Sequence, residues 1–176
     1  MVNFGSFFLF ATAITALPSL VRRDTAETLA NLKGIDNSTR SLTTTVTSWD
    51  GSLLGALGIQ SAATAVGTQI DNANTAASDE PQASSADSQT IITYVTGTLT
   101  PDIQASLTAL TNRKADFQSL GITSIVLSTL QSLQSKSAAL GTTLVNIASA
   151  DQKAAAQSAA DAINAAFAAA VTAFSS

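Results

Sequence analysis

Residues 122–147 read ITSIVLSTLQSLQSKSAALGTTLVNI, and this stretch decides the fold class. Large apolar residues and one small serine recur along it in alternating steps of four and three, which is the period of a helix with one buried face. This stripe consists of Val126, Leu130, Leu133, Ser137, Leu140, Leu144 and Ile147. A helix of this length is about 39 Å long, so it needs equally long partners. We expect it near the middle of an antiparallel helical bundle.

The composition excludes several classes of chemistry. The chain of 176 residues contains no histidine and no cysteine. Their absence excludes a Ser–His–Asp triad, a cysteine nucleophile and nearly all zinc and haem sites, and we expect no cofactor, no metal and no disulfide. The 12 acidic residues outnumber the 8 basic ones, which gives a net charge of −4. Because no basic stripe is visible either, nucleic-acid binding is not expected.

The N-terminus resembles a secretory signal peptide at residues 1–16, where small residues follow an apolar run. The run is shorter than the roughly 20 apolar residues that a membrane span needs. We therefore predict export, with cleavage after Ala16 as the first choice and after Ala13 as the second. Residues 17–23 are a candidate pro-segment ending in Arg22–Arg23, although two solvated charges before a helix explain this pair equally well.

Two long helices are predicted before the quoted stretch. The capping-box pattern of residues 24–27 predicts a first helix from Asp24 to about Trp49. Residues 50–52 are typical of a turn, in which Ser52 is the N-cap of a second helix at about 53–77. Alanine and glycine occupy many positions of the apolar stripe of this second helix, so the stripe has little side-chain volume. Such a stripe either lets neighbouring helices approach closely or leaves a cavity.

A loop at 78–83 precedes a third helix, for which Ser84 or Ser85 is the expected N-cap. The proline at position 101 lies inside this helix. We expect Pro101 to kink the helix rather than divide it, because the apolar spacing continues across it. Gly121 is the expected C-cap.

Ser149 and Gln152 form another capping box, which predicts a last helix over about 150–174. No segment keeps the alternating pattern of a strand. The predicted fold is all-α, an antiparallel bundle of about five long helices with the third kinked at a proline. It forms one domain over residues 24–176.

The order and spacing of several short motifs resemble the fungal hydrophobic surface binding protein A family, also called cell wall galactomannoproteins. The motifs are Val46–Gly51 (VTSWDG), Leu99–Ile103 (LTPDI), Leu110–Phe117 (LTNRKADF) and Ala165–Phe167 (AAF). The resemblance covers essentially all of residues 24–176. It implies a secreted or wall-associated helical bundle that adsorbs to hydrophobic surfaces and recruits a secreted polyester-degrading hydrolase. Some wall mannoproteins of this type bind fatty acids between their helices.

A binding module for apolar ligands or surfaces is the first functional interpretation. Amphipathic helices with thin apolar stripes can enclose a lipid tail, and apolar burial contributes about 0.8 kcal/mol per methylene. The candidate lining residues are apolar positions on the inward stripes of the helices. They are Val66, Ile70, Val95, Leu107, Leu130, Leu133, Ile163 and Phe167. The alternative is that these residues are ordinary core.

Catalysis is not expected, because Asp116 with its basic neighbours and the pair Ser132 and Lys136 are typical of solvated helix faces. A structural or antigenic wall mannoprotein without a specific small ligand is the alternative to a lipid-binding module. Asn37 begins an Asn-Ser-Thr sequon that can carry an N-glycan if it is exposed.

Overall fold

The structure, a computed structural model, describes the backbone of residues 18–176 and the side chains from residue 25 onward. This part of the chain is helical and contains no strand. Its elements are α1 (Pro18–Thr47), α2 (Leu53–Ser78), α3 (Ser85–Tyr94), the π-helical segment η1 (Val95–Leu99), α4 (Thr100–Asn112), α5 (Lys114–Ser119), α6 (Thr123–Ile147) and α7 (Lys153–Ser175). The predicted signal peptide lies outside the described residues. None of the described helices is long and apolar enough to span a membrane.

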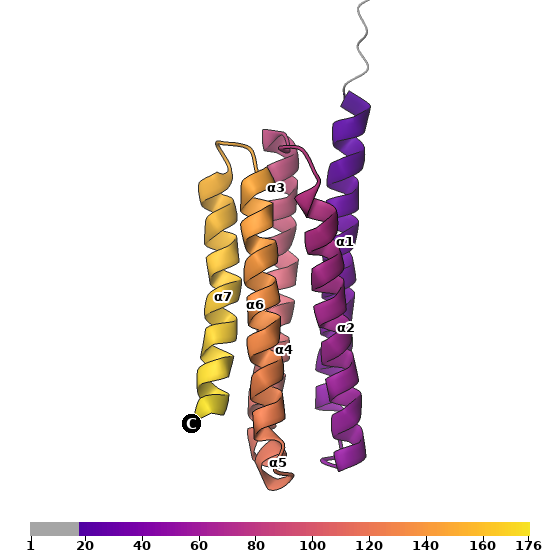
Figure 1. Cartoon of the computed structure of the whole chain (residues 1–176), viewed down its shortest axis with the longest axis vertical. Helices are drawn as coiled ribbons and strands as arrows, with labels where there is room; N and C mark the ends of the chain where they lie inside the picture. Colours follow the sequence, from indigo (N-terminus) through magenta and orange to yellow (C-terminus); the bar gives the residue numbers. More distant parts are fainter. Residues whose placement is uncertain (1–17) are drawn as a thin grey trace, which may run out of the picture.

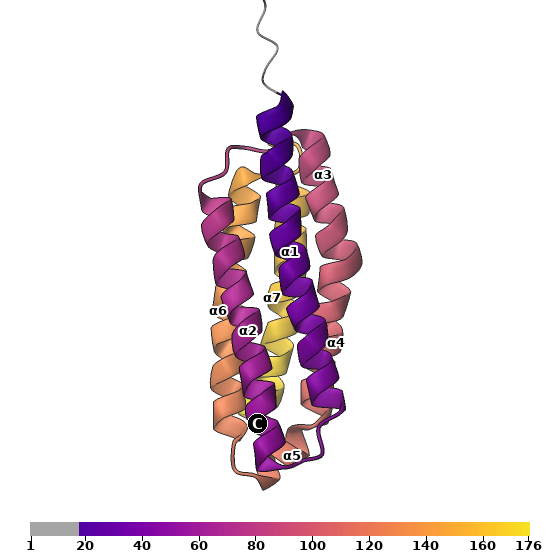
Figure 2. The same cartoon turned by 90° about the vertical axis from the view of Figure 1, so that its right-hand side faces the viewer.

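Five long rods stand side by side (Figures 1 and 2), because α3, η1 and α4 follow one another without a gap and form one rod. The contacts between the rods close into a ring. Helix α1 packs against α2 and α4, α2 packs against α6, α6 packs against α7, and α7 packs against α4. Rods that follow one another in the chain are antiparallel (Figure 1). A ring of five rods cannot alternate throughout, so α2 and α6, for example, run in the same direction.

Helix α6 is the predicted long helix, but the expectation that it lies near the middle of the bundle is wrong. It is one member of the ring, and each of the described rods packs chiefly against two neighbours, so none lies on the axis. The physical reason is in its own pattern. The apolar residues of α6 lie on one face and its other face is polar. The helix therefore needs to bury only that one face, which a place in the ring allows.

Two predicted N-caps are confirmed, whereas Gly121 follows the short helix α5 and not the longer helix that it was expected to end. The Ser52 hydroxyl accepts a hydrogen bond from the Gly55 N–H at 3.0 Å, and the Ser84 hydroxyl accepts one from the Asp87 N–H at 3.2 Å. Gly121 has a φ of 70° after α5, which is the left-handed conformation that glycine adopts at low cost. These three turns position the ends of α2, α3 and α5.

Two helix starts differ from the prediction. Helix α1 begins at Pro18 rather than at Asp24, because proline suits a first helical turn, where its missing N–H is not needed. Helix α7 begins at Lys153 rather than at residue 150. The predicted capping box does not form there, because the Ser149 N–H donates to the Ser88 hydroxyl at 2.9 Å and the Ser149 hydroxyl has no hydrogen-bond partner.

A π-helical turn directly precedes Pro101, the residue at which the sequence predicts a kink. The Thr100 N–H bonds to the carbonyl of Val95, five residues earlier, and Pro101 lies in the first turn of α4. Proline cannot donate to the carbonyl four residues before it, and the wider turn accommodates this missing bond. The rod continues across the proline as predicted, but it ends at Asn112 instead of running to Leu120, and α5 is a separate short helix.

Limited proteolysis should cut within residues 79–83 before it cuts at residues 97–100. The first segment is a largely exposed loop, whereas the second is helical and includes the buried Leu99 and Thr100. Mass spectrometry of early fragments is the measurement. Preferred cutting at 97–100 would instead mean that the third rod is two helices with a mobile joint.

Candidate functional site

An internal cavity of about 90 Å³ occupies the axis of the ring, and all five rods contribute to its wall. In this measure a water molecule needs about 10–15 Å³, so the space corresponds to roughly six to nine waters. The lining residues of α6 alone extend from Leu133 to Ile147, which is about 21 Å along the helix. The cavity is therefore long and narrow, a shape that matches an extended alkyl chain.

The cavity exists because helix α7 presents small side chains to the axis. Ala156, Ala159 and Ala160 lie on its wall, where larger residues would fill the space. Helices α6 and α7 also approach closely, since a Cβ atom on Gly141 would lie only 3.0 Å from the Ala160 Cβ. Most of the remaining wall is aliphatic, with the Phe167 ring and a few hydroxyls among the lining residues.

Seven of the eight lining residues expected from the sequence lie on this wall. They are Val66, Ile70, Val95, Leu107, Leu133, Ile163 and Phe167. Leu130 is 1% exposed but is not part of the wall. It lies one turn before Leu133 on α6, toward the end of the ring at which α5 lies. Spacing along a helix cannot distinguish these two environments.

The wall also includes residues that were not among the candidates. Helix α1 contributes four positions, namely Leu32, Ile35, Thr39 and Leu42. The apolar spacing in α1 could have identified its three aliphatic positions as lining candidates. Nothing in the sequence distinguished the lining hydroxyls of Ser88 and Ser106 from the many surface hydroxyls of the chain.

Aromatic residues close one end of the ring. The rings of Trp49 and Phe117 stack with centroids 4.7 Å apart, and Phe117 also contacts Phe174 at 6.1 Å. The Arg113 guanidinium lies 5.0 Å from the Trp49 ring centroid and donates to the Trp49 carbonyl at 2.6 Å. This cluster joins α5 to the ends of α1 and α7.

At the opposite end, hydrogen bonds link the α2–α3 loop to the end of α6, and the start of α3 to the α6–α7 loop. The Ala83 N–H donates to the Ile147 carbonyl at 2.7 Å, and the Ser85 hydroxyl donates to the Asp151 carboxylate at 2.5 Å. The Ser85 bond, with support from nearby polar groups, lowers the pKa of Asp151 to about 2. Ala83 and Ala148 of these loops belong to the cavity wall.

None of the described lining residues carries a charge. One buried carboxyl, that of Asp36, lies outside the wall and accepts a hydrogen bond from the Tyr94 hydroxyl at 3.1 Å. Burial and the neighbouring Asp102 carboxyl raise the pKa of Asp36, and burial together with Asp36 raises the pKa of Tyr94 to about 12. The cavity thus offers apolar surface and a few hydroxyls to a ligand.

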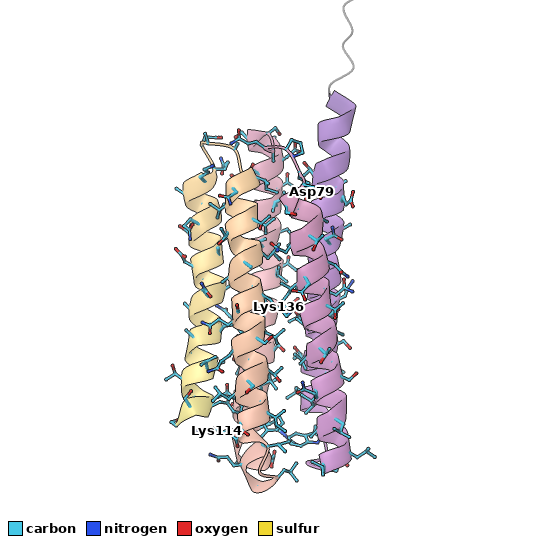
Figure 3. The ribbon with its side chains drawn as sticks, viewed as in Figure 1. Asp79, Lys114 and Lys136 are labelled. Carbon is cyan, nitrogen blue, oxygen red and sulfur yellow. The ribbon has the colours of Figure 1, made fainter. Side chains whose placement is uncertain are left out.

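The polar pairs considered for catalysis lie outside the cavity. Lys136 projects from α6 toward α2 (Figure 3), where it forms an ion pair with Asp71. Asp116 pairs with Arg113 at 2.9 Å. Among the described residues, no group of three or more carboxylates could hold a metal ion. Asn37 of the sequon is exposed on α1.

Leu130→Ala should destabilise the protein more than Leu133→Ala, although both side chains are buried on α6. Leu130 is packed away from the cavity, so its loss should cost about 2–5 kcal/mol through lost burial and a new cavity. Leu133 already borders empty space, so its loss should fall at or below about 2 kcal/mol. Urea unfolding measures both values, and equal large losses would mean that the cavity is closed in solution.

The comparisons with known proteins agree with this geometry. The family model described as hydrophobic surface binding protein A matches residues 25–146. None of the curated proteins matches the chain significantly. The crystal structure of AFMP4P in complex with palmitic acid is 36% identical, has a TM-score of 0.82, and is matched over 85% of this chain and 99% of that one.

Two more distant structures share the fold. Ligand binding domain 1 of the Penicillium marneffei MP1 protein, complexed with arachidonic acids, has a TM-score of 0.82 at 16% identity, over 86% of this chain and 99% of that one. Ligand binding domain 2 of the same protein, complexed with multiple arachidonic acids, has a TM-score of 0.79 at 14% identity, over 83% and 92%.

Proposed function

The chain belongs to the hydrophobic surface binding protein A family, and from this premise we propose that it is a non-catalytic binding protein that holds a single-chain lipid, such as a fatty acid, in its axial cavity. The observation that supports this function is the long, narrow, uncharged cavity between the five rods. An alkyl chain gains about 0.8 kcal/mol for each methylene that it buries. Such a ligand binds well without a charged partner, and the 36%-identical AFMP4P was crystallised with palmitic acid.

Extraction of lipid from the purified protein tests this function. Mass spectrometry of the extract should reveal bound fatty acids, and the delipidated protein should take up palmitic acid with about one molecule per chain. A protein that carries no lipid and takes up none would contradict the proposal. Such a result would favour the alternative of a wall mannoprotein whose glycans, at Asn37 and at hydroxyl side chains, matter more than its core.

Adsorption to hydrophobic surfaces is a second proposed function, and exposed leucines at one end of the bundle support it. Leu53, Leu54 and Leu57 are 58%, 79% and 61% exposed in the first turns of α2, and Ile125 is 53% exposed on α6. The two helices are parallel neighbours. Hydrogen bonds between Thr129 and Gln60 and between Thr143 and Asn74 join residues 69 positions apart. This register brings Leu57 and Ile125 to nearly the same level.

We further propose that the protein is exported and that residues 1–16 are removed. A second cut after Arg23 would shorten only the first turns of α1, which project beyond the neighbouring helices (Figure 1). N-terminal sequencing of protein from the culture medium tests this, and recovery of intact Met1 would contradict it. Recruitment of a secreted polyester hydrolase is implied by the family resemblance, and co-sedimentation of such an enzyme with protein-coated polyester particles tests it.

A further inference from the structure

Ser106 has an unusual position among the hydroxyls of this bundle. It lies on α4, is 3% exposed, belongs to the cavity wall, and its Oγ atom has no hydrogen-bond partner. Thr39 on the neighbouring helix α1 also lines the cavity, but its hydroxyl donates to the Ile35 carbonyl at 2.9 Å. Buried hydroxyls are rarely left unpaired, and each exception needs an explanation. A polar group of a bound ligand would supply the missing partner.

The charges around Ser106 indicate which head group fits. Lining residues carry no charge, so an ionised carboxylate in the cavity would lose its hydration without gaining a cation. Toward α1 the charged groups are Asp36, which is buried, and Arg40, whose side chain is 66% exposed and lies 3.8 Å from Asp102 of α4. Of the charged residues of α7, Lys153 lies at the first position of the helix, at the loop end, and both Lys153 and Asp161 are exposed. None of these groups places a positive charge at the cavity wall.

We propose that Ser106 anchors an uncharged head group that can form hydrogen bonds, so that the cavity selects the neutral form of a single-chain lipid. The hydroxyl of a fatty alcohol and the protonated carboxyl of a fatty acid share this chemistry. Ser106 lies about 27 Å along its rod from Ser88 at the loop end, so the head group is held deep in the bundle. This inference rests on the proposed lipid-binding function of the cavity.

The first test compares Ser106→Ala with Thr100→Val. Thr100 is the matched control, because its hydroxyl is also buried and unpaired on α4 but does not line the cavity. Binding of 1-dodecanol and of dodecane is measured by displacement of the neutral dye N-phenyl-1-naphthylamine. Ser106→Ala should weaken dodecanol binding about two- to tenfold, as expected for one net hydrogen bond, and should leave dodecane binding unchanged. Thr100→Val should change neither.

Thermal unfolding without ligand should show that neither variant is destabilised, because each substitution removes an unpaired buried hydroxyl. Equal binding of dodecanol by wild type and Ser106→Ala would overturn the anchor while leaving the lipid-binding function intact. Failure of the wild type to bind any of these ligands would overturn both.

The second test uses dodecanoic acid, whose carboxyl is expected to titrate near the value of a glutamic acid side chain, about 4.3. The neutral acid predominates below this pH and the carboxylate above it. Relative to dodecanol, the acid should therefore bind at least tenfold more weakly at pH 8 than at pH 4. If the ratio of dodecanoic acid affinity to dodecanol affinity does not change with pH, the carboxylate is held in water and not inside the cavity, which would overturn selection of the neutral form.

Discussion

Ala159→Phe is expected to weaken fatty-acid binding about a hundredfold and to leave the fold intact. Ala159 is 4% exposed and lies on the cavity wall of α7. A phenyl ring there would occupy the space of about four methylenes, and at about 0.8 kcal/mol each this loss is about 3 kcal/mol. A tenfold change corresponds to about 1.4 kcal/mol, so the expected loss is two orders of magnitude.

The matched control is Ala165→Phe, which places the same ring on the exposed face of the same helix. It should bind fatty acid as the wild type does. Isothermal titration with delipidated protein measures binding, and thermal unfolding measures stability.

A well-packed core would not tolerate the ring at position 159, because overpacking costs typically about 1–3 kcal/mol or more. In a cavity, the ring fills space that is already empty, and the melting temperature should stay within a few degrees of the wild type. Wild-type affinity in a folded Ala159→Phe protein would contradict the placement of the ligand. Loss of binding through unfolding would show that the axis of the ring is packed in solution.

Phe117→Ala is expected to lower the free energy of unfolding by about 3–5 kcal/mol. Phe117 is 1% exposed, stacks on Trp49 at 4.7 Å and contacts Phe174 at 6.1 Å. These contacts join α5 to the ends of α1 and α7, so no neighbouring side chain can fill the space without moving one of these elements. Urea unfolding followed by circular dichroism is the measurement.

Phe117→Leu serves as the comparison, because it keeps most of the apolar volume and should cost clearly less than the alanine substitution. The two variants together separate the loss of volume from the loss of aromatic stacking. A cost below about 1 kcal/mol for Phe117→Ala would mean that the aromatic cluster does not close this end of the ring.

Spacing, caps and turns predicted the local structure well, because these signals act over a few residues. The four-and-three stripe of residues 122–147 became α6 almost to the residue. The hydroxyl of Ser52 caps α2, and Gly121 adopts the positive φ expected of a helix C-cap. Where a long-range contact competed with a local signal, the prediction failed. The capping box at Ser149 was displaced because its backbone N–H bonds to Ser88, 61 residues away in the chain.

The sequence by itself determined that the chain forms long amphipathic helices, which side of each helix is buried, and that histidine and cysteine chemistry is absent. Only the tertiary structure decided that the helices form a ring around a cavity, that Leu133 borders this cavity while Leu130 does not, and that the Ser106 hydroxyl has no partner. The physical reason is that an apolar stripe shows which side of a helix is removed from water. It does not show what that side contacts. Whether opposing side chains meet across the axis depends on the distances between all five rods, and the alanines of α7 are too small to reach across it.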